Sequence, residues 1–279
     1  MAALSELTRT LISAHLEVFV ENLVNDYRNR AVEPMVTPAG YLSRTDAKGS
    51  LKPFHAAIVP SEVLRISAFE RGLVTRLGSS LEQCALLIAR QRYPEAQRGY
   101  ELSGDISTNA LAEIDRQLDA FERVNSDGKR RPALNDMVDA VLRVNSGGPT
   151  AERRKKVDLF LRSSSGSEYY FEMKSPKPNK DQCARITQGI LQVHALRQQA
   201  RPKVRSYLAF PYNPYGNSRA DYNWSYPKNY LPFDEAVLVG DEFWTLLGGP
   251  GAYEELLEIY HYVGRVKGKF IAEALAFGN

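Results

Sequence analysis

Two acidic residues and a lysine lie close together in the middle of the sequence, within two segments rich in β-branched and aromatic residues. Asp158 belongs to VDLFLR at 157–162, and Glu172 and Lys174 belong to EYYFEMK at 168–174. Side chains two positions apart on a strand point to the same face, so Glu172 and Lys174 lie together. If the two segments pair across the turn SSSGS, Asp158 lies at the end of the hairpin that holds the other two. The pattern therefore predicts that two carboxylates and an ammonium converge.

This combination of groups suits the hydrolysis of a phosphate ester. Carboxylates are the ligands that a hard cation such as Mg²⁺ requires, and Mg²⁺ usually keeps waters and shares phosphate oxygens of its substrate. An ammonium can hold the attacking water or help to deprotonate it, and it can stabilise charge on the phosphate. We therefore assign Asp158, Glu172 and Lys174 to catalysis, and Asp158 and Glu172, together with Met173, to a metal site.

The same residues also have a purely structural explanation. Acids and lysines on neighbouring strands most often form an ion-pair ladder on the surface of a hairpin. Here, however, Asp158 lies in VDLFL and Glu172 in YYFEM, so both acids have strongly apolar neighbours. Charges in such surroundings are costly unless a metal or a partner compensates them. The surroundings therefore favour a site over a ladder.

The first 60 residues are predicted to form a helical arm followed by an irregular connection. Apolar residues recur at roughly helical spacing over 4–23, and prolines at 34, 38, 53 and 60 interrupt the stretch 31–60. We therefore expect two parts, an N-terminal arm at 1–60 and a larger domain at 61–279.

Two helices with a break between them are expected next. An apolar stripe over 61–76 predicts the first helix, and Gly78 is expected to end it. Ser79 and Glu82 stand three apart just before the apolar run LEQCALLIA. This is a capping-box pattern, in which the two residues begin a new helix.

The remaining segments predict an α/β fold with a central mixed β-sheet flanked by helices. Helices are expected near Ser107 and over 134–142, before the hairpin, and over 182–199 after it. The runs VRSYLAF and EAVLVG are predicted to be further strands, and GGPG separates two helical segments near the C-terminus. Helices, a hairpin, and strands separated by a helix and a long aromatic loop together indicate this fold class.

Composition and missing motifs exclude several classes of protein. No apolar run approaches the roughly 20 residues that span a bilayer, so no membrane is expected. The first 15 residues show no secretory signal, and two cysteines, Cys84 and Cys183, suit a reducing cytoplasm. The four histidines lack HNH and HExxH spacing, and no GxxxxGKS/T, GxGxxG or CxxC motif occurs. We therefore expect a cytoplasmic protein without a nucleotide cofactor.

Charge is unevenly distributed along the chain, although the net charge is only +3. Between Ala151 and Arg205, thirteen basic residues face five acids, a surplus of eight positive charges. From Pro232 to the end, three basic residues face eight acids. A basic middle region is what binding to a polyanion requires, but a solvated face whose charges pair elsewhere explains the same pattern.

The arrangement of Asp158, Glu172 and Lys174 resembles the PD-(D/E)xK nuclease signature, with Val157 where that pattern usually has proline. Further motifs follow in order: FERGLVTRLGSSLEQCALLIA, KVDLFLR, YYFEMKSPKPN, FPYNPYG and LVGDEFWTLLGG. From about Ser61 onward, these motifs are similar to the TdeIII-like group of type II restriction endonucleases. The three-residue signature is short, and the ordered run of motifs is the stronger part of the resemblance.

The resemblance implies a restriction-endonuclease-like sheet, Mg²⁺-dependent hydrolysis of phosphodiester bonds in double-stranded DNA, and a homodimer. It gives Asp158 and Glu172 the role of metal-binding acids and Lys174 that of the catalytic lysine. On this basis the domain at 61–279 is a nuclease domain.

Three further residues are candidates for the active site. Many members of the superfamily also use a glutamate from an early helix, and Glu82 is the best match, although capping alone would explain its position. Glu70, in AFERG, is the second choice for this role. Gln188 is an auxiliary candidate for ordering a water or a phosphate, although a solvated glutamine is the simpler interpretation.

Basic residues near the hairpin are candidates for contacts with the DNA backbone. Lys177 and Lys180 directly follow the strand of the catalytic lysine, and Lys129, Arg130 and Arg131 occupy the turn SDGKRRP. Contacts of this kind give affinity and register but do not select a sequence.

The aromatic loop FPYNPYGNSRADYNWSYPKNYLPF supplies the candidates for base contacts. Asn217 and Arg219 are the candidates, since arginine pairs bidentately with guanine. The tyrosines and the tryptophan of this loop are expected to pack against the core or a second subunit.

The function expected from these observations is that of a type II restriction endonuclease that cuts DNA at a short palindromic sequence. Two alternatives remain at this point: a structure-specific nuclease of repair or recombination with the same core, and a non-catalytic DNA-binding module that has kept the fold. The presence of all three acting residues speaks against the second alternative.

Overall fold

The hairpin predicted around the acidic residues is confirmed. In the computed structural model, β2 (Thr150–Arg162) and β3 (Glu168–Met173) pair in antiparallel fashion, with Leu159 opposite Phe171. The turn between them contains Gly166 at a φ of 80°, a conformation that glycine adopts without strain. The two acids and the lysine therefore lie at the end of the hairpin away from its turn.

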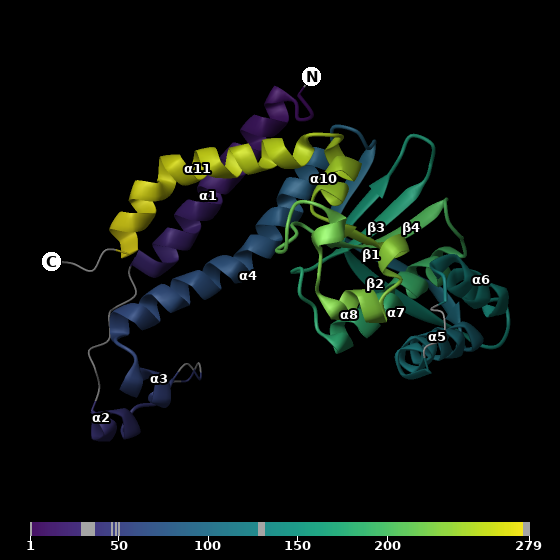
Figure 1. Cartoon of the computed structure of the whole chain (residues 1–279), viewed down its shortest axis with the longest axis horizontal. Coiled ribbons are helices and arrows are strands. Elements are labelled where there is room, and N and C mark those ends of the chain that lie inside the picture. The colour runs from purple at the N-terminus through teal and green to yellow at the C-terminus, as the bar shows by residue number, and fades with distance from the viewer. Residues whose placement is uncertain are drawn as a thin grey trace. The chain divides into compact units, whose positions relative to one another are not determined.

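This hairpin lies in the middle of a five-stranded sheet with the order β1-β2-β3-β4-β5 (Figure 1). The other strands are β1 (Glu95–Ser107), β4 (Val204–Phe210) and β5 (Val237–Val239). β1 runs antiparallel to β2, whereas β3, β4 and β5 are parallel to one another. The predicted α/β fold with a central mixed sheet is therefore confirmed.

The structure describes residues 2–28, 37–45, 47, 49, 51–127 and 132–275. The chain divides into two compact units, one formed by 1–9 and 81–256 and the other by 10–80 and 257–279. The predicted boundary between 1–60 and 61–279 stays a prediction. Within the described residues, no helix is long and apolar enough to cross a membrane.

The sheet belongs to the first unit, in which helices pack on it. These elements are α5 (Thr108–Asp127), α6 (Leu134–Val144), α7 (Lys180–Arg197), the 3₁₀ turn η1 (Arg219–Asp221), α8 (Ser225–Tyr230), α9 (Phe233–Ala236) and α10 (Asp241–Gly248). A single cluster of buried side chains joins α5, α6 and α7 to strands β2, β3 and β4. The helices predicted near Ser107, over 134–142 and over 182–199 are confirmed.

Helix α7 is fixed at its start by a capping box. The side chain of Asn179 accepts a hydrogen bond from the backbone N–H of Gln182, whose side chain in turn accepts one from the N–H of Asn179. This arrangement satisfies backbone donors that the first turn of a helix leaves free. It anchors α7 directly after the loop that follows β3.

The second unit is helical. It takes parts of α1 (Glu6–Arg28), α4 (Ser61–Ala89) and α11 (Ala252–Leu275), and it contains α2 (Pro38–Leu42) and α3 (Pro53–Ile58). Leu23, Val24, Tyr27 and Phe69 form its buried cluster. The stretch 31–60, predicted to be irregular, thus holds two short helices in the part that the structure describes.

The predicted break at Gly78 is wrong, because α4 runs without interruption from Ser61 to Ala89. Gly78 does not have a positive φ, and its place in a helix of 29 residues costs only about 1 kcal/mol relative to alanine. The capping box predicted for Ser79 and Glu82 is therefore also wrong. Backbone donors in the middle of a helix already bond to carbonyls one turn earlier, so Glu82 has no cap to make.

Two glycines of α4 should respond in opposite ways to the same substitution. A Cβ at Gly78 meets no atom within 4 Å, whereas a Cβ at Gly72 would lie 2.1 Å from Oη of the buried Tyr27. We expect Gly78→Ala to raise the free energy of unfolding by about 0.5–1 kcal/mol. Gly72→Ala should lower it by about 1–3 kcal/mol. Urea denaturation followed by circular dichroism measures both, and a destabilising Gly78→Ala would argue for a break in α4.

Candidate active site

The acidic residues lie where the two strands of the hairpin separate. Pairing between β2 and β3 ends with Leu159 opposite Phe171. Beyond that point β2 continues along β1 as far as Thr150, while β3 continues along β4 as far as Met173. The strands therefore form a fork, and Asp158 is the first residue of β2 inside it.

Asp158 is fixed in the fork by the backbone of β3. Its Oδ2 accepts a hydrogen bond of 2.7 Å from the N–H of Met173. Burial raises the pKa of the Asp158 carboxyl most; the bond from Met173 lowers it, and the nearby charge of Glu172 raises it again. The net shift is upward, so the protein as it stands disfavours the charged form that a metal would need.

Glu172 is held between two lysines. Its Oε1 lies 2.8 Å from Nζ of Lys174, as the shared face of these two residues predicts. Its Oε2 lies 3.6 Å from Nζ of Lys155, a residue that the sequence analysis placed in the basic region but not in the site. Lys155 is three positions before Asp158 on β2. Side chains an odd number of positions apart on a strand point to opposite faces, so the sequence pattern does not place Lys155 beside Asp158.

Glu82 contributes a third carboxylate close enough to interact with Asp158. Burial raises the pKa of Glu82, and the charge of Asp158 raises it further, while Arg98 and Lys174 lower it. Nε of Arg98, on β1, lies 3.5 Å from Oε2 of Glu82. Glu82 is not a capping residue, and its partly buried charge pairs with Arg98. Glu70, the second choice, is exposed and belongs to the other unit.

The donor set of the fork matches what Mg²⁺ binds. Asp158 and Glu172 present carboxylate oxygens, and no hydrogen bond reaches Oδ1 of Asp158 from any residue that the structure describes. Among those residues, no three histidine, cysteine or acidic side chains are grouped tightly enough to enclose a metal. An open set of two carboxylates, completed by waters and phosphate oxygens, is typical of Mg²⁺ rather than of a closed structural site. Met173 meets this site through its backbone, and its role as a ligand stays a prediction.

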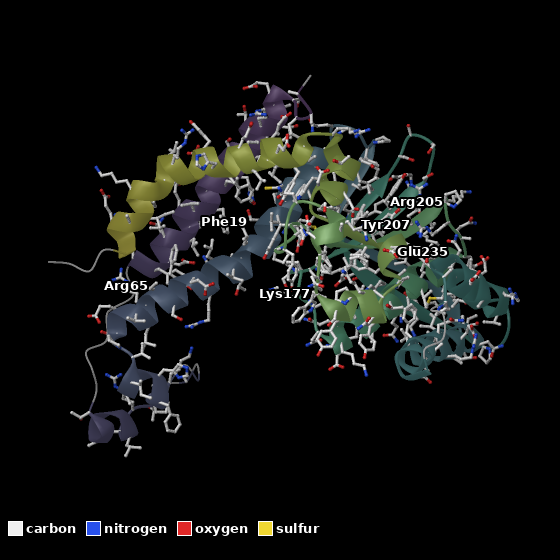
Figure 2. The ribbon with its side chains drawn as sticks, viewed as in Figure 1. Phe19, Arg65, Lys177, Arg205, Tyr207 and Glu235 are labelled. Carbon is white, nitrogen blue, oxygen red and sulfur yellow. The ribbon has the colours of Figure 1, made fainter. Side chains whose placement is uncertain are left out.

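The loop after β3 carries the two lysines predicted to meet DNA. Nζ of Lys177 lies 5.1 Å from the ring centre of Tyr215 and 5.8 Å from that of Trp224, and Nζ of Lys180 lies 5.2 Å from that of Tyr230. Lys177 is exposed, and Figure 2 shows it in the sheet-containing unit, apart from Arg205, Tyr207 and Glu235.

The aromatic loop folds back onto the loop after β3. Tyr222 is fully buried and donates a hydrogen bond to the carbonyl of Pro176, and the indole of Trp224 donates one to the carbonyl of Pro178. These rings therefore pack within the unit, as the composition of the loop suggested. They also hold the loop that carries Lys177.

Arg219 is bonded to its own chain. It makes two hydrogen bonds of 2.7 Å to the carboxylate of Glu242, and its remaining N–H groups donate to the carbonyls of Phe233 and Val237. A contact of Arg219 with a base would require these bonds to break. Asn217, two positions earlier, is exposed. Gln188 is half-buried on α7, and Lys129, Arg130 and Arg131 lie outside the described residues.

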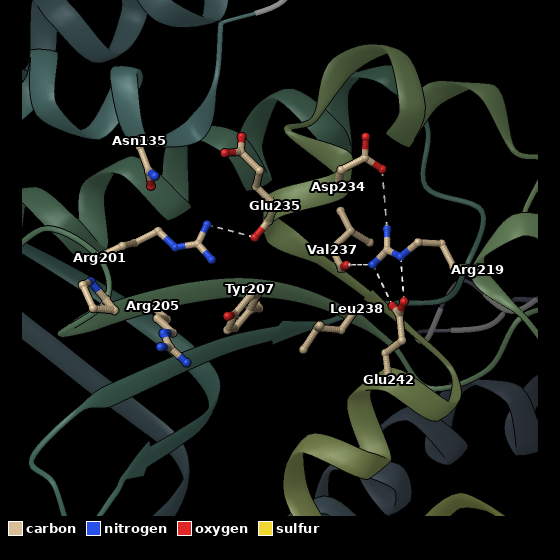
Figure 3. Close-up of a pocket in the computed structure, with 11 residues that line it drawn as sticks. Asn135, Arg201, Arg205, Tyr207, Arg219, Asp234, Glu235, Val237, Leu238 and Glu242 are labelled. Atoms are coloured by element: carbon tan, nitrogen blue, oxygen red, sulfur yellow. Dashed lines mark hydrogen bonds and ion pairs between the residues drawn. The ribbon is translucent and has the colours of Figure 1, made fainter. Parts of the chain in front are cut away.

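The same arginine lines a pocket of about 750 Å³ beside β4 and β5 (Figure 3). Three arginines and three acids line it, together with Asn135, Pro202, Tyr207, Val237 and Leu238. Arg201 donates to the carbonyl of Glu235, and Arg219 pairs with Glu242, so much of this charge is neutralised locally. Asp158, Glu172 and Lys174 are not among the residues that line this pocket, so the pocket and the fork are separate.

Carboxylates and an ammonium grouped at the fork of a mixed sheet are suited to metal-assisted hydrolysis of phosphate esters. A family model described as "Type II restriction endonuclease, HinfI" matches residues 12–264. The type II restriction enzymes HgiEI, HgiBI and HgiCII from Herpetosiphon aurantiacus are 37%, 36% and 35% identical over 273 residues, which is 98% of this chain and 99% of each relative. The chain belongs to the HinfI family of type II restriction endonucleases, enzymes that cleave DNA.

The resemblance to type II restriction endonucleases is therefore confirmed, and it decides against a repair nuclease and a non-catalytic module. The narrower similarity to the TdeIII-like group stays a prediction. The family match begins at residue 12, so the similarity also covers the N-terminal region, which the sequence motifs had not included.

The raised pKa of Asp158 has a consequence for stability without metal. Because the native state binds this proton more tightly than the unfolded chain, stability falls as the pH rises from the ordinary value of 3.8 through the raised pKa. We expect Asp158→Asn, which keeps an acceptor for Met173, to raise the melting temperature at pH 7.5 in EDTA. The gain should shrink as the pH approaches 4.

Calorimetry at several pH values measures this effect. Asp105→Asn is the matched control, because Asp105 is an exposed acid on β1. A melting temperature of Asp158→Asn equal to that of the wild type at pH 7.5 would mean that the fork does not oppose the charge of Asp158.

Proposed function

We propose that this chain is a Mg²⁺-dependent type II endonuclease with a PD-(D/E)xK active site, which hydrolyses double-stranded DNA at a short palindromic sequence. The observation that carries the proposal is the fork between β2 and β3, which groups Asp158, Glu172 and Lys174. Asp158 and Glu172 are the residues that would hold the metal, with Met173 beside them. When bound, Mg²⁺ supplies charge for the phosphate and a more acidic water.

Lys174 acts as a donor in this proposal. Burial lowers the pKa of its ammonium, but the hydrogen bond and the charge of Glu172, together with the charges of Asp158 and Glu82, outweigh burial, so the net shift is upward. The ammonium is therefore protonated at neutral pH. In that state Lys174 orients the attacking water and stabilises negative charge on the phosphate, and it does not remove the proton of the water.

Glu82 completes the acidic cluster in this proposal. Its carboxylate, on α4, interacts with that of Asp158. Because Glu82 lies inside a continuous helix, it does not cap a helix end. Burial raises the pKa of both acids, and the charge of Asp158 raises that of Glu82 further, so a divalent cation that binds near them stabilises both in the charged form. We infer that Glu82 contacts the metal through a water, because no three acidic side chains of the described residues are grouped tightly enough to enclose an ion.

The protein is proposed to act as a homodimer in the cytoplasm. A palindromic site has two-fold symmetry, and a protein that reads both halves alike needs the same symmetry, which two copies of one chain provide. The two cysteines, Cys84 and Cys183, are buried and form no disulfide, in keeping with a reducing compartment.

The proposal is tested first by cleavage. Incubation of plasmid and phage DNA with the protein and Mg²⁺ should give discrete, reproducible bands, and EDTA should abolish them. Glu172→Gln and Lys174→Met should each lower the rate of cleavage by a factor of about 10² or more. Glu82→Gln should do so in a protein that remains folded, and Glu70→Gln, an exposed change on the same helix, should cleave normally. Normal cleavage by Glu172→Gln would refute the assignment of the site.

DNA binding is expected to depend strongly on salt. Each phosphate that a lysine neutralises releases condensed counterions. Lys177→Ala should therefore reduce the slope of log affinity against log salt concentration by about 0.9, and it should weaken binding to all DNA sequences alike. Asn217→Ala should instead weaken only the cognate site, by about 1–3 kcal/mol, if it reads a base. Lys269→Ala, which changes an exposed lysine of the acidic C-terminal helix, is the control.

Fluorescence titrations of cognate and scrambled duplexes measure these effects, and light scattering of the complex gives two chains per duplex if the enzyme is a dimer. An unchanged salt dependence for Lys177→Ala would make the basic loop a solvated face. A single chain on the cognate duplex would contradict the dimer.

A further inference from the structure

Lys155 is a second lysine beside Glu172, and its ammonium contacts two different elements. Nζ of Lys155 is 3.6 Å from Oε2 of Glu172, and Lys174 holds the other oxygen of the same carboxylate. Only 25% of the Lys155 side chain is exposed. A lysine that is this far withdrawn from water on a strand next to the catalytic acids is not an ordinary surface cation.

The second of these elements is α7, at a glycine. A Cβ at Gly189 would lie 2.8 Å from Nζ and 2.9 Å from Cε of Lys155, so the lysine lies directly against the helix backbone. Gly189 is buried in the interior of a helix, where glycine is less favourable than alanine. The space that it leaves for Lys155 is the benefit visible in this structure.

The acids of the fork are compensated without a metal. Asp158 and Glu172 face Lys155 and Lys174, and Glu82 faces Arg98 and Lys156. A divalent cation added to this set creates a surplus of positive charge. The groups that can balance the surplus are the phosphates of DNA, which also attract an ammonium displaced from Glu172.

We propose that Lys155 is a second active-site lysine, which holds Glu172 in the metal-free enzyme and transfers to a phosphate oxygen of the DNA when a divalent cation takes Glu172. The inference rests on the proposed function of the fork. Lys155 competes with the cation for one carboxylate, so the enzyme binds metal weakly until DNA is present. Metal and DNA then bind cooperatively, because each removes a cost of binding the other.

The test uses two substitutions that remove the same contact by different means. Lys155→Met removes the charge and keeps a long side chain, whereas Gly189→Ala keeps the charge and displaces the ammonium. Both should slow cleavage of cognate DNA at saturating Mg²⁺ by about a hundredfold. Both should also tighten binding of Mn²⁺ to the DNA-free enzyme by about fivefold, since a competing ion pair is lost. Electron paramagnetic resonance of free Mn²⁺ measures the binding.

Controls separate this role from a structural one. Gly264→Ala is the matched helical change, because a Cβ there meets no atom within 4 Å, and it should alter neither readout. Lys155→Arg should recover part of the cleavage rate by keeping a positive charge at that position. Circular dichroism of each variant confirms the fold, and Lys155→Met carries the test if Gly189→Ala does not fold.

The outcomes distinguish the two proposals. If Glu172→Gln is inactive but Lys155→Met cleaves and binds Mn²⁺ like the wild type, the fork is the active site and the role of Lys155 is refuted. Slower cleavage of Lys155→Met with unchanged Mn²⁺ binding also refutes the competition with the cation. If Glu172→Gln cleaves normally, the proposed function itself fails.

Discussion

The site depends on one hydrogen bond, from the backbone N–H of Met173 to Oδ2 of Asp158. The N–H of Lys174 donates a hydrogen bond to β4. The N–H of Met173 points to the opposite side, where β2 no longer pairs with β3. A donor left there without a partner would be costly, because it is shielded from water. The carboxylate of Asp158 takes the place of the missing strand carbonyl, and the same bond fixes the direction of its other oxygen.

The charges around this bond keep the fork together before any ligand arrives. Acids brought close together repel one another, and burial adds to the cost of each charge. Lys155, Lys174 and Arg98 supply compensating positive charge from two strands of the sheet and from the residue after β3. The acids are therefore held near one another before a ligand binds, which reduces the reorganisation that binding of a cation would require.

The hairpin and its three polar residues were predictable because alternation along a strand relates Glu172 to Lys174 and the short turn fixes the register. Strand β1 was not predicted, since its sequence EAQRGYELSGDIS is polar and contains two glycines, as an edge strand allows. The continuity of α4 through Gly78 was missed because local capping signals compete with packing along the helix. Lys155 enters the site through the space at Gly189, a tertiary contact that no spacing in the sequence expresses.

The hydrogen bonds of Arg219 have a consequence for which positions of the aromatic loop can vary. The guanidinium joins the aromatic loop to Glu242 on α10 and to the carbonyl of Val237 on β5, so replacing it disturbs the edge of the sheet. Asn217, two positions earlier, is exposed and takes no part in these hydrogen bonds of Arg219. Neighbouring positions of one loop thus differ in mutational tolerance: substitutions at Asn217 leave the packing of the loop intact, whereas loss of the arginine does not.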